Sequence, residues 1–263
     1  NADGKLHYVP TSAQPIRHFP TKDNKVHGAI EFYQLPEIDK NTREPFANRY
    51  ILGHDPVDND SAETMSLSST FVLDLWTDKI VAEYTGRPTF ADDFYEKCRL
   101  LCLFYNARLN YESNKKGLFA YFSKMNCLYL LTDVLEYLKD KDMVKGNLIG
   151  NKSKGTNASQ PINNYARTLI RNWLILPKVV ITNDGEKDIE TTTYNLNFIR
   201  NKALLQELSQ WNVDGNFDRV SALGMLMLLR EDKMISYGGE PQKAREVPTS
   251  YLGNDPFFQN NYD

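Results

Sequence analysis

Three acidic residues stand at positions where a carboxylate suggests chemistry, because each follows or opens an apolar segment. Asp55 lies near the end of Arg49–Pro56, and Glu112 ends the segment 108–112. Asp218 lies in the first turn of a late apolar segment. The first two segments read as strands and the third as a helix. Neighbouring strand ends meet at one sheet edge, and a helix N-terminus facing that edge keeps a third carboxylate ionised. We therefore predict that the three acids converge.

Carboxylates gathered in this way favour divalent-metal chemistry. Anions at one place repel each other unless cations bind between them, and two ions ~3.5–4 Å apart can hold a phosphodiester and activate a water. All four histidines lie at or before position 54, which disfavours the usual zinc sites and histidine-based nucleophilic catalysis. We therefore predict that Asp55, Glu112 and Asp218 are both catalytic residues and ligands of two Mg²⁺ or Mn²⁺ ions.

Structural roles are the alternative for the same acids. The chain holds 34 acidic residues, so three of them near the ends of elements is no surprise. Asp55 precedes a proline and is compatible with an Asx turn, while Asp218 is compatible with a helix cap. Spacing alone does not choose between these roles and a metal site.

The apolar periodicity predicts the elements that must position the acids. After a polar, proline-rich lead-in with one edge strand at 29–33, the chain alternates strands and helices. We expect strands at 49–56, 69–76, 80–84, 108–112, 127–131, 179–183 and 189–194, and helices at 90–107, 115–125, 161–175, 196–211 and 217–229. The lysine- and glycine-rich stretch 139–160 is predicted to be a mobile loop. We therefore predict an α/β fold with a mixed sheet flanked by helices, in the order of elements expected of a ribonuclease-H-like fold.

Composition sets the limits on partners. The chain of 263 residues is 41% hydrophobic and 25% charged, which is typical of a globular protein. No apolar run reaches the ~18 residues of a membrane span, so no membrane partner is expected. A net charge of −3 gives no overall signal for nucleic acid, so DNA binding would depend on local basic patches. The three cysteines, Cys98, Cys102 and Cys127, are predicted to be buried reduced thiols.

Local sequence blocks around the acids resemble the nuclease domain of large terminase subunits from tailed bacteriophages. The resemblance covers about 29–231 and is carried by the blocks 50–56, 69–74, 80–87, 105–107, 111–117 and 216–223. It implies a ribonuclease-H-like endonuclease and places Asp55, Glu112 and Asp218 on the three acidic positions of the family. One departure is that Phe217 stands where the family often has a further acid. Candidates to replace that acid are Asp58, Asp60 and Asp214.

The resemblance also implies a biological setting. Such enzymes cut concatemeric viral DNA during genome packaging, in the host cell cytoplasm at the procapsid portal. The implied partners are double-stranded DNA, the portal, a small terminase subunit and an ATPase domain of the same polypeptide. No GxxxxGK[ST] string occurs in this sequence. We divide the chain into an arm at 1–48, a nuclease domain at 49–231 and a tail at 232–263.

Basic side chains near these blocks are candidate DNA contacts, although each is also compatible with ordinary surface charge. They are Lys115, Lys116, Lys152, Lys154, Arg167 and Arg171. The hairpin around Asn183 is a candidate DNA-regulating element by analogy only. Two other functions remain open. One is a same-fold junction resolvase or RNA–DNA hybrid nuclease, and the other is a non-catalytic interaction module of a packaging machine.

Overall fold

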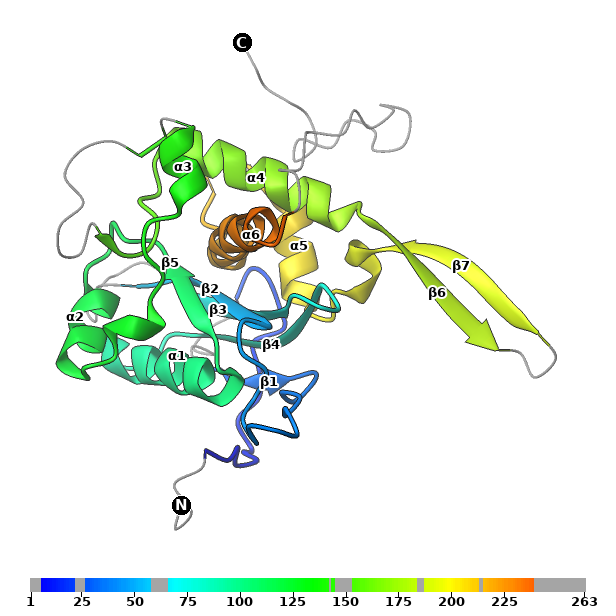
Figure 1. Ribbon diagram of the computed structural model, residues 1–263. Helices are drawn as coiled ribbons and strands as arrows, with labels where there is room; N and C mark the ends of the chain where they lie inside the picture. The colour runs from blue at the N-terminus through cyan, green and yellow to red at the C-terminus, as the bar shows by residue number, and fades with distance from the viewer. Residues whose placement is uncertain are drawn as a thin grey trace.

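A five-stranded mixed sheet lies at the centre of the molecule, with helices on both faces (Figure 1). The computed structural model describes residues 6–21, 27–57, 66–141, 143–144, 153–183, 187–212 and 215–238. The strand order is β1-β4-β3-β2-β5. The strands are β1 (Glu31–Phe32), β2 (Tyr50–Asp55), β3 (Ser68–Asp74), β4 (Lys79–Gly86) and β5 (Arg108–Tyr111). Strand β5 runs parallel to β2, and the other pairs are antiparallel. The predicted mixed sheet is therefore confirmed.

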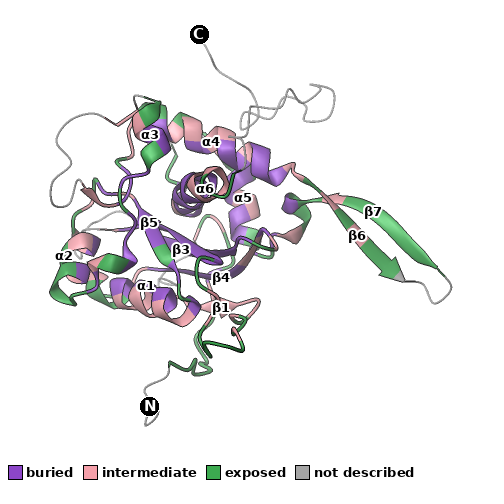
Figure 2. Ribbon diagram, viewed as in Figure 1, coloured by how far each residue is buried: buried purple, intermediate pink, exposed green. Residues whose placement is uncertain are grey.

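The central strands are buried on both faces, which explains their nearly continuous apolar sequences. Every residue of β2 and β3 is buried. Their side chains alternate between two hydrophobic cores, one on each face of the sheet. Figure 2 shows this buried centre between helices that are exposed on their outer sides.

One helical layer covers the lower face of the sheet in Figure 1. It consists of α1 (Ala91–Tyr105) and α2 (Gly117–Lys124). Helix α1 ends at Asn106, which adopts a left-handed conformation and donates its backbone N–H to carbonyls of the last turn. The chain then enters β5 within two residues, so the end of α1 fixes where β5 begins.

The other helical layer is built around α6 (Asp218–Ser236), which lies against β2, β3 and β5 and beneath α4 (Figure 1). Helix α6 has buried residues around most of its circumference, as a helix between two layers requires. The layer also contains α3 (Glu136–Asp140), α4 (Gln160–Leu174) and α5 (Lys202–Gln210). No helix in the described ranges is long and apolar enough to cross a membrane.

A two-stranded ribbon, β6 (Pro177–Asn183) and β7 (Asp188–Tyr194), projects away from this body (Figure 1). Most of its described side chains are exposed (Figure 2). Its base is fixed to the β3–β4 turn, because the Lys178 ammonium donates to the carbonyls of Thr77 and Asp78. The Asn195 amide donates to the Asp78 carboxylate at 3.0 Å. The hairpin prediction is confirmed, and its tip at 184–186 lies outside the described residues.

Four segments differ from the sequence-based predictions. Residues Leu128–Leu130 form a 3-10 helix, and only Leu131 makes a strand-like bridge, to Leu109. The helix predicted at 196–211 is broken into a 3-10 turn (Asn195–Phe198) and α5, because the Asn201 side chain caps α5 by accepting from Leu204 N at 2.9 Å.

The other two differences concern a loop and the tail. Residues 154 and 156 bridge to Asp133 and Glu112, so this part of the predicted mobile loop extends the sheet edge. Helix α6 continues to Ser236, past the start of the predicted tail at 232, because Met234 and Ile235 still pack on the core.

Candidate active site

Two of the predicted acids end adjacent parallel strands. The β2–β5 register pairs His54 with Tyr111, so Asp55 and Glu112 come next on the two strands. The Glu112 backbone N–H donates to the His54 carbonyl at 3.3 Å and continues the pairing to this point. Parallel strands end at the same sheet edge, so the two carboxylates lie there together.

Both acids face helix α6. Gly53 lies directly beneath α6, and a Cβ added there would come within 2.5 Å of three Leu226 atoms. On the neighbouring strand, the Asn110 side chain donates to the Met225 carbonyl at 2.9 Å. Alternate residues of a strand share a face, so Asp55 and Glu112 project to the same side as Gly53 and Asn110.

The third acid reaches the site from the start of α6. Asp218 Oδ2 accepts a hydrogen bond from Leu67 N at 2.9 Å. Leu67 immediately precedes β3, where Ser69 is the register partner of Asp55. The contact therefore fixes the helix N-terminus over the end of β2 at which Asp55 lies.

A lysine ammonium lies between the first two acids. Lys115 Nζ is 2.7 Å from Asp55 Oδ1 and 3.3 Å from Glu112 Oε2. We predicted Lys115 as a DNA contact, but here it neutralises the carboxylates. It reaches them because the turn after β5 folds back, with Lys115 N donating to the Glu112 carbonyl at 3.4 Å.

The electrostatics of the site favour added positive charge. Burial raises the pKa of Asp55 well above its ordinary value, and the nearby Glu112 and Asp218 charges add to this increase while Lys115 opposes it. Burial lowers the pKa of Lys115, but the Asp55 and Glu112 charges outweigh it, so the net shift is upward. Both directions show that the site stabilises a bound proton or cation.

Asp218 differs from the sequence-based prediction in its electrostatics. The helix N-terminus was expected to keep this carboxylate ionised, yet its pKa is raised. Burial is the main cause, and the Leu67 N–H and the Lys115 and Arg219 charges only partly compensate for it. Asp218 therefore also gains from a nearby cation.

The acids fit oxygen-preferring ions, although the arrangement is not a preformed cage. Within the part of the chain that the structure describes, no three acidic, histidine or cysteine side chains are grouped closely enough to hold an ion. Asp55 and Glu112 nevertheless lie within 3.3 Å of the same Lys115 nitrogen, the position where a cation would find two carboxylates. Carboxylate oxygens are the ligands that Mg²⁺ and Mn²⁺ prefer. The donor set therefore fits the predicted ions.

The histidine next to Asp55 takes no part in the site. His54 is completely buried on the other face of the sheet, where its ring stacks on Phe94 at 5.1 Å. Its Nδ1 lies 2.8 Å from the Ser69 carbonyl, to which it donates. Burial lowers the pKa of His54 to about 3, so the ring is neutral at physiological pH.

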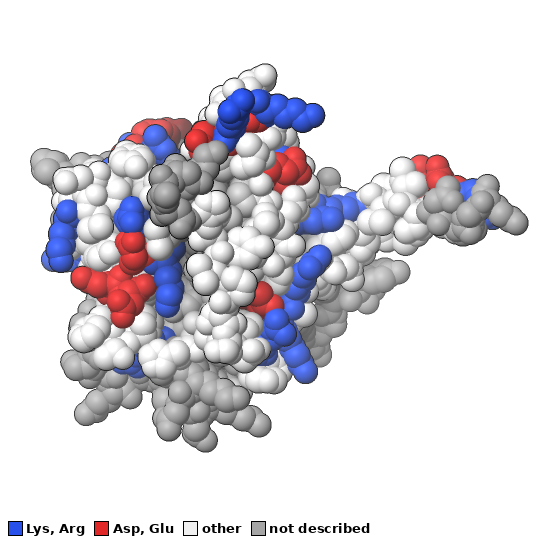
Figure 3. All heavy atoms as spheres, turned by 90° about the horizontal axis from the view of Figure 1, so that it is seen from below, with Lys and Arg blue, Asp and Glu red and all other residues white. Residues whose placement is uncertain are grey.

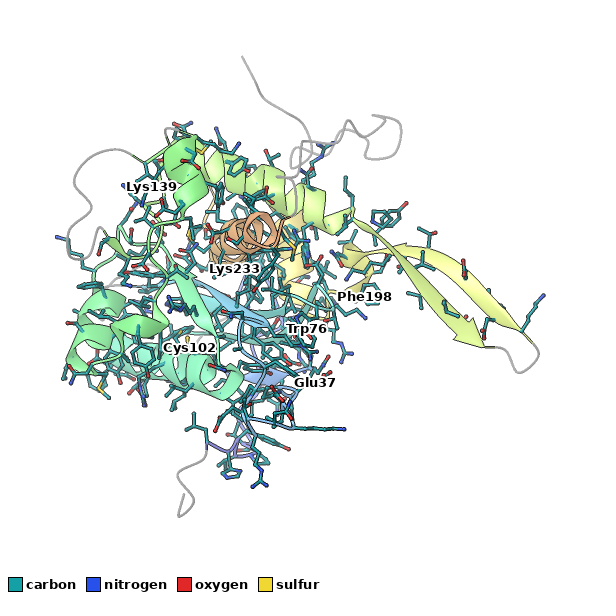
Figure 4. The ribbon with its side chains drawn as sticks, viewed as in Figure 1. Glu37, Trp76, Cys102, Lys139, Phe198 and Lys233 are labelled. Atoms are coloured by element: carbon teal, nitrogen blue, oxygen red, sulfur yellow. The ribbon has the colours of Figure 1, made fainter. Side chains whose placement is uncertain are left out.

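The cysteines are confirmed as free, buried thiols, and burial raises the pKa of each of them. Cys102 lies in the α1 layer beneath the sheet (Figure 4). Thiolate chemistry and metal binding through sulfur are therefore disfavoured at these positions.

The other predicted basic contacts have varied surroundings. Lys116 is exposed beside the site, whereas Lys154 pairs with Asp133 at 2.7 Å. Arg167 stacks on Trp211 at 3.8 Å, and Arg171 is partly buried one turn further along α4. On the face shown in Figure 3, acidic and basic side chains are interspersed among the described residues. Lys152 and the candidate acids Asp58, Asp60 and Asp214 lie outside the described ranges.

Sequence reasoning missed Glu207, which holds the start of α6 in place. Its carboxylate accepts the backbone N–H groups of Arg219 and Val220 at 2.9 and 3.2 Å and pairs with the Arg219 guanidinium at 2.6 Å. Burial raises the pKa of Glu207 to about 7. A signal was present in the sequence, because Glu207 falls on the apolar stripe of α5 with Ala203, Leu204 and Leu208.

Comparison with known proteins gives only distant matches. No protein-family model matches the sequence, and no curated protein matches it significantly. The crystal structure of the large terminase nuclease from thermophilic phage G20c is 14% identical, with coverage of 74% of this chain and 91% of that chain and a TM-score of 0.26. The same nuclease with bound magnesium is 14% identical, with 74% and 92% coverage and a TM-score of 0.30. These overlaps are too loose to assign this chain to a family.

Proposed function

We propose that this protein is a divalent-metal-dependent DNA endonuclease that hydrolyses phosphodiester bonds at Asp55, Glu112 and Asp218. The observation that carries the proposal is the pair of strand-end carboxylates sharing one lysine ammonium, with the charge of a third, half-buried acid, Asp218, acting on Asp55. A purely structural ion pair gains nothing from surplus buried negative charge. A site that binds cations does, because the surplus becomes favourable when the ions bind.

The sheet topology supports a ribonuclease-H-like core. Strands β2, β3 and β4 form a consecutive antiparallel meander, and β5 joins the far side of β2 in parallel after a helical crossover. Asp55 on the first strand of this unit and Glu112 after the crossover strand then lie side by side. This arrangement, rather than the overall charge, supports the proposed fold type.

In this proposal the three acids and the two neighbouring lysines have different roles. Asp55 and Glu112 hold positive charge at the strand ends, and Asp218 completes the anionic site from the helix. Two Mg²⁺ or Mn²⁺ ions bound there would supply charge that activates a water and stabilises the departing oxygen. The Lys115 side chain is one-third exposed, which leaves it room to turn from the acids towards a DNA phosphate. Lys116 is exposed next to it.

The biological role rests on the sequence blocks described above. We propose that the protein cuts concatemeric viral DNA during genome packaging in the host cytoplasm. Double-stranded DNA, the portal, a small terminase subunit and an ATPase domain of the same polypeptide are its proposed partners. The arm at 1–48, nuclease domain at 49–231 and tail at 232–263 stay a prediction.

Plasmid nicking with Mn²⁺ tests the activity. We expect Asp55→Asn and Glu112→Gln each to reduce the nicking rate by about 10²–10³-fold, the loss typical of removing one preorganised charged group from an active site. Asp140→Asn is the matched control, because this acid is exposed at the end of α3. Full nicking by a folded Asp55→Asn protein would refute the site, whereas no nicking by the folded wild type would favour a non-catalytic interaction module.

Substrate choice separates the proposal from other enzymes of the same fold. Linear duplex, a four-way junction and an RNA–DNA hybrid are offered to the wild-type protein under the same conditions. We expect the duplex to be cut at least as fast as the other two. Clear preference for the junction or the hybrid would replace the packaging role with that of a resolvase or a hybrid nuclease.

A further inference from the structure

A pocket between α4 and α6 opens beside Glu112. Its volume is about 110 Å³, and Glu112 forms part of its wall. Gly224 and Met225 of α6 and Ala166 and Ile170 of α4 provide apolar walls. Figure 1 shows these two helices lying one over the other. The same carboxylate therefore belongs to the proposed active site and to this pocket.

The pocket has the size of one six-membered aromatic ring. An apolar cavity of about 150 Å³ inside a protein holds a benzene molecule. This pocket is slightly smaller but open on one side, so a planar ring enters with its edge towards solvent. A fused two-ring system would protrude from it. The size therefore favours a pyrimidine over a purine.

A planar cation and an aromatic ring form the rim. The Arg167 guanidinium lies 3.8 Å from the centre of the Trp211 ring, and both residues line the pocket. Burial lowers the pKa of Arg167, which reflects how far its guanidinium is withdrawn from water. Unstacked nucleobases are commonly bound by stacking on aromatic rings and arginine planes.

The position along α6 connects the pocket to the proposed chemistry. Ser221 lines the pocket and lies one helical turn after Asp218, on the same face of the helix. A nucleoside with its base in the pocket would extend its phosphate towards Glu112 and Asp218. A base that is still paired and stacked in a duplex cannot enter.

We propose that this pocket binds a pyrimidine base turned out of its stack, next to the phosphate that is cut. This inference rests on the proposed nuclease function and adds to it a preference, within duplex DNA, for a cut beside a residue that is locally unpaired. It also assigns Arg167 and Trp211 to base binding, which specifies the kind of DNA contact first predicted for Arg167.

Filling the pocket tests the inference. Gly224→Leu adds a side chain to the pocket wall, whereas Gly224→Ala is the matched control, because a Cβ at 224 meets only Ala166 Cβ, at 3.4 Å. Thermal unfolding of both variants establishes that they are folded. Trp211→Leu is a second variant that removes the rim without filling the pocket.

Binding is measured by fluorescence anisotropy of a labelled oligothymidine strand in Ca²⁺, compared with a strand of abasic residues. We expect wild type and Gly224→Ala to bind oligothymidine about tenfold more tightly than the abasic strand, and Gly224→Leu and Trp211→Leu to lose this difference. Equal binding of the two strands by wild type would overturn the base site. So would an undiminished difference in both the Gly224→Leu and the Trp211→Leu proteins.

Cleavage of duplexes that carry one unpaired residue, with Mn²⁺, separates the two proposals. We expect wild type to cut beside an unpaired thymidine about tenfold faster than beside an unpaired adenosine or within a fully paired duplex. Cleavage at equal rates would overturn the base site and leave the nuclease function intact. Base-dependent binding without any cleavage would support the base site and refute the nuclease function.

Discussion

The two ends of the β2–β3 pair treat a buried acid in opposite ways. At one end, Asp74 receives two hydrogen bonds from the Arg49 guanidinium, at 3.0 and 2.7 Å. Arg49 also pairs with Glu37 at 2.6 Å and lies 4.4 Å above the Trp76 ring. Glu37 and Trp76 are labelled at this side of the sheet in Figure 4. At this end, the buried Asp74 carboxylate is therefore paired with a guanidinium that is itself held by a second acid and an aromatic ring.

At the other end, a single ammonium group is present in a site with three acids. Asp55 and Glu112 share Lys115, and the pKa values of Asp55 and Asp218 are raised by burial. Buried charge by itself therefore does not mark a functional site. Incomplete neutralisation does, because a fold gains nothing from it until a cation or a substrate binds.

The largest expected effect comes from breaking the neutralised end. Arg49→Met should lower the free energy of unfolding by about 3–5 kcal/mol, because it leaves Asp74 buried without its partner. Urea denaturation followed by circular dichroism measures the loss. If the variant is as stable as the wild type, Asp74 does not depend on Arg49 and the contrast between the two ends fails.

At the end of the β2–β3 pair that carries Asp55, removing a charged side chain should change the free energy of unfolding in the opposite direction. We expect Asp55→Asn, measured without divalent ions at neutral pH, to raise the free energy of unfolding by about 1–2 kcal/mol. The reason is that the variant removes a buried charge that the fold does not fully compensate. Asp74→Asn is the matched comparison and should be destabilising. A strongly destabilised Asp55→Asn protein would make Asp55 a structural residue.

The pH dependence of the free energy of unfolding should also distinguish wild type from Asp55→Asn. A carboxyl group whose pKa is raised by folding contributes stability below its unfolded pKa, and this contribution is lost as pH rises through the folded pKa. Metal-free wild type should therefore lose stability as pH increases from about 4. Glu83 and Glu207, whose pKa values burial raises to about 7, add to this loss in both proteins. Asp55→Asn should show a shallower decline, and parallel curves would contradict the raised pKa of Asp55.

A smaller effect is expected from removing the shared ammonium. Lys115→Met should bind Mn²⁺ about tenfold more tightly, equivalent to about 1.4 kcal/mol, because no lysine competes for the carboxylates. Isothermal titration calorimetry measures the affinity, and Lys116→Met is the exposed neighbouring control. Weaker binding by Lys115→Met would mean that the lysine holds the acids in position rather than competing with the ion.

The smallest effect concerns the surface beside the site. Lys116→Ala should weaken duplex binding slightly and reduce the slope of log affinity against log salt by about 1, because one phosphate contact is lost. Anisotropy titrations over a range of salt concentrations give the slope. An unchanged slope would remove Lys116 from the DNA-binding surface.

Much of the fold and of the acid positions could be predicted from local sequence. The strands that place Asp55 and Glu112, and the helix that begins at Asp218, are apolar segments with clear periodicity. Short apolar runs were less informative, since 127–131 has the composition of a strand but forms a 3-10 turn. Over so few residues, the hydrophobic periodicity alone does not distinguish a strand from a 3-10 turn.

Long-range partners could not be predicted in this way. The pairing of Arg49 with Asp74, and of Arg230 with Asp78, has no local signature because the residues are far apart in the chain. The position of Lys115 between two acids depends on the path of the turn after β5. Its charge and its place in the sequence fit a phosphate contact equally well.

Gly53 has no functional group, yet it controls how closely α6 approaches β2 and therefore where Asp218 lies relative to Asp55. A methyl group at this position would have to displace the Leu226 backbone. Asp218 lies about two helical turns before Leu226 in the same helix, so we expect such a displacement to be transmitted to the acid. A screen that scored only the proposed nuclease activity would rank Gly53 among the essential residues. Its contribution, however, is only that it lacks a side chain and so lets α6 pack closely on β2.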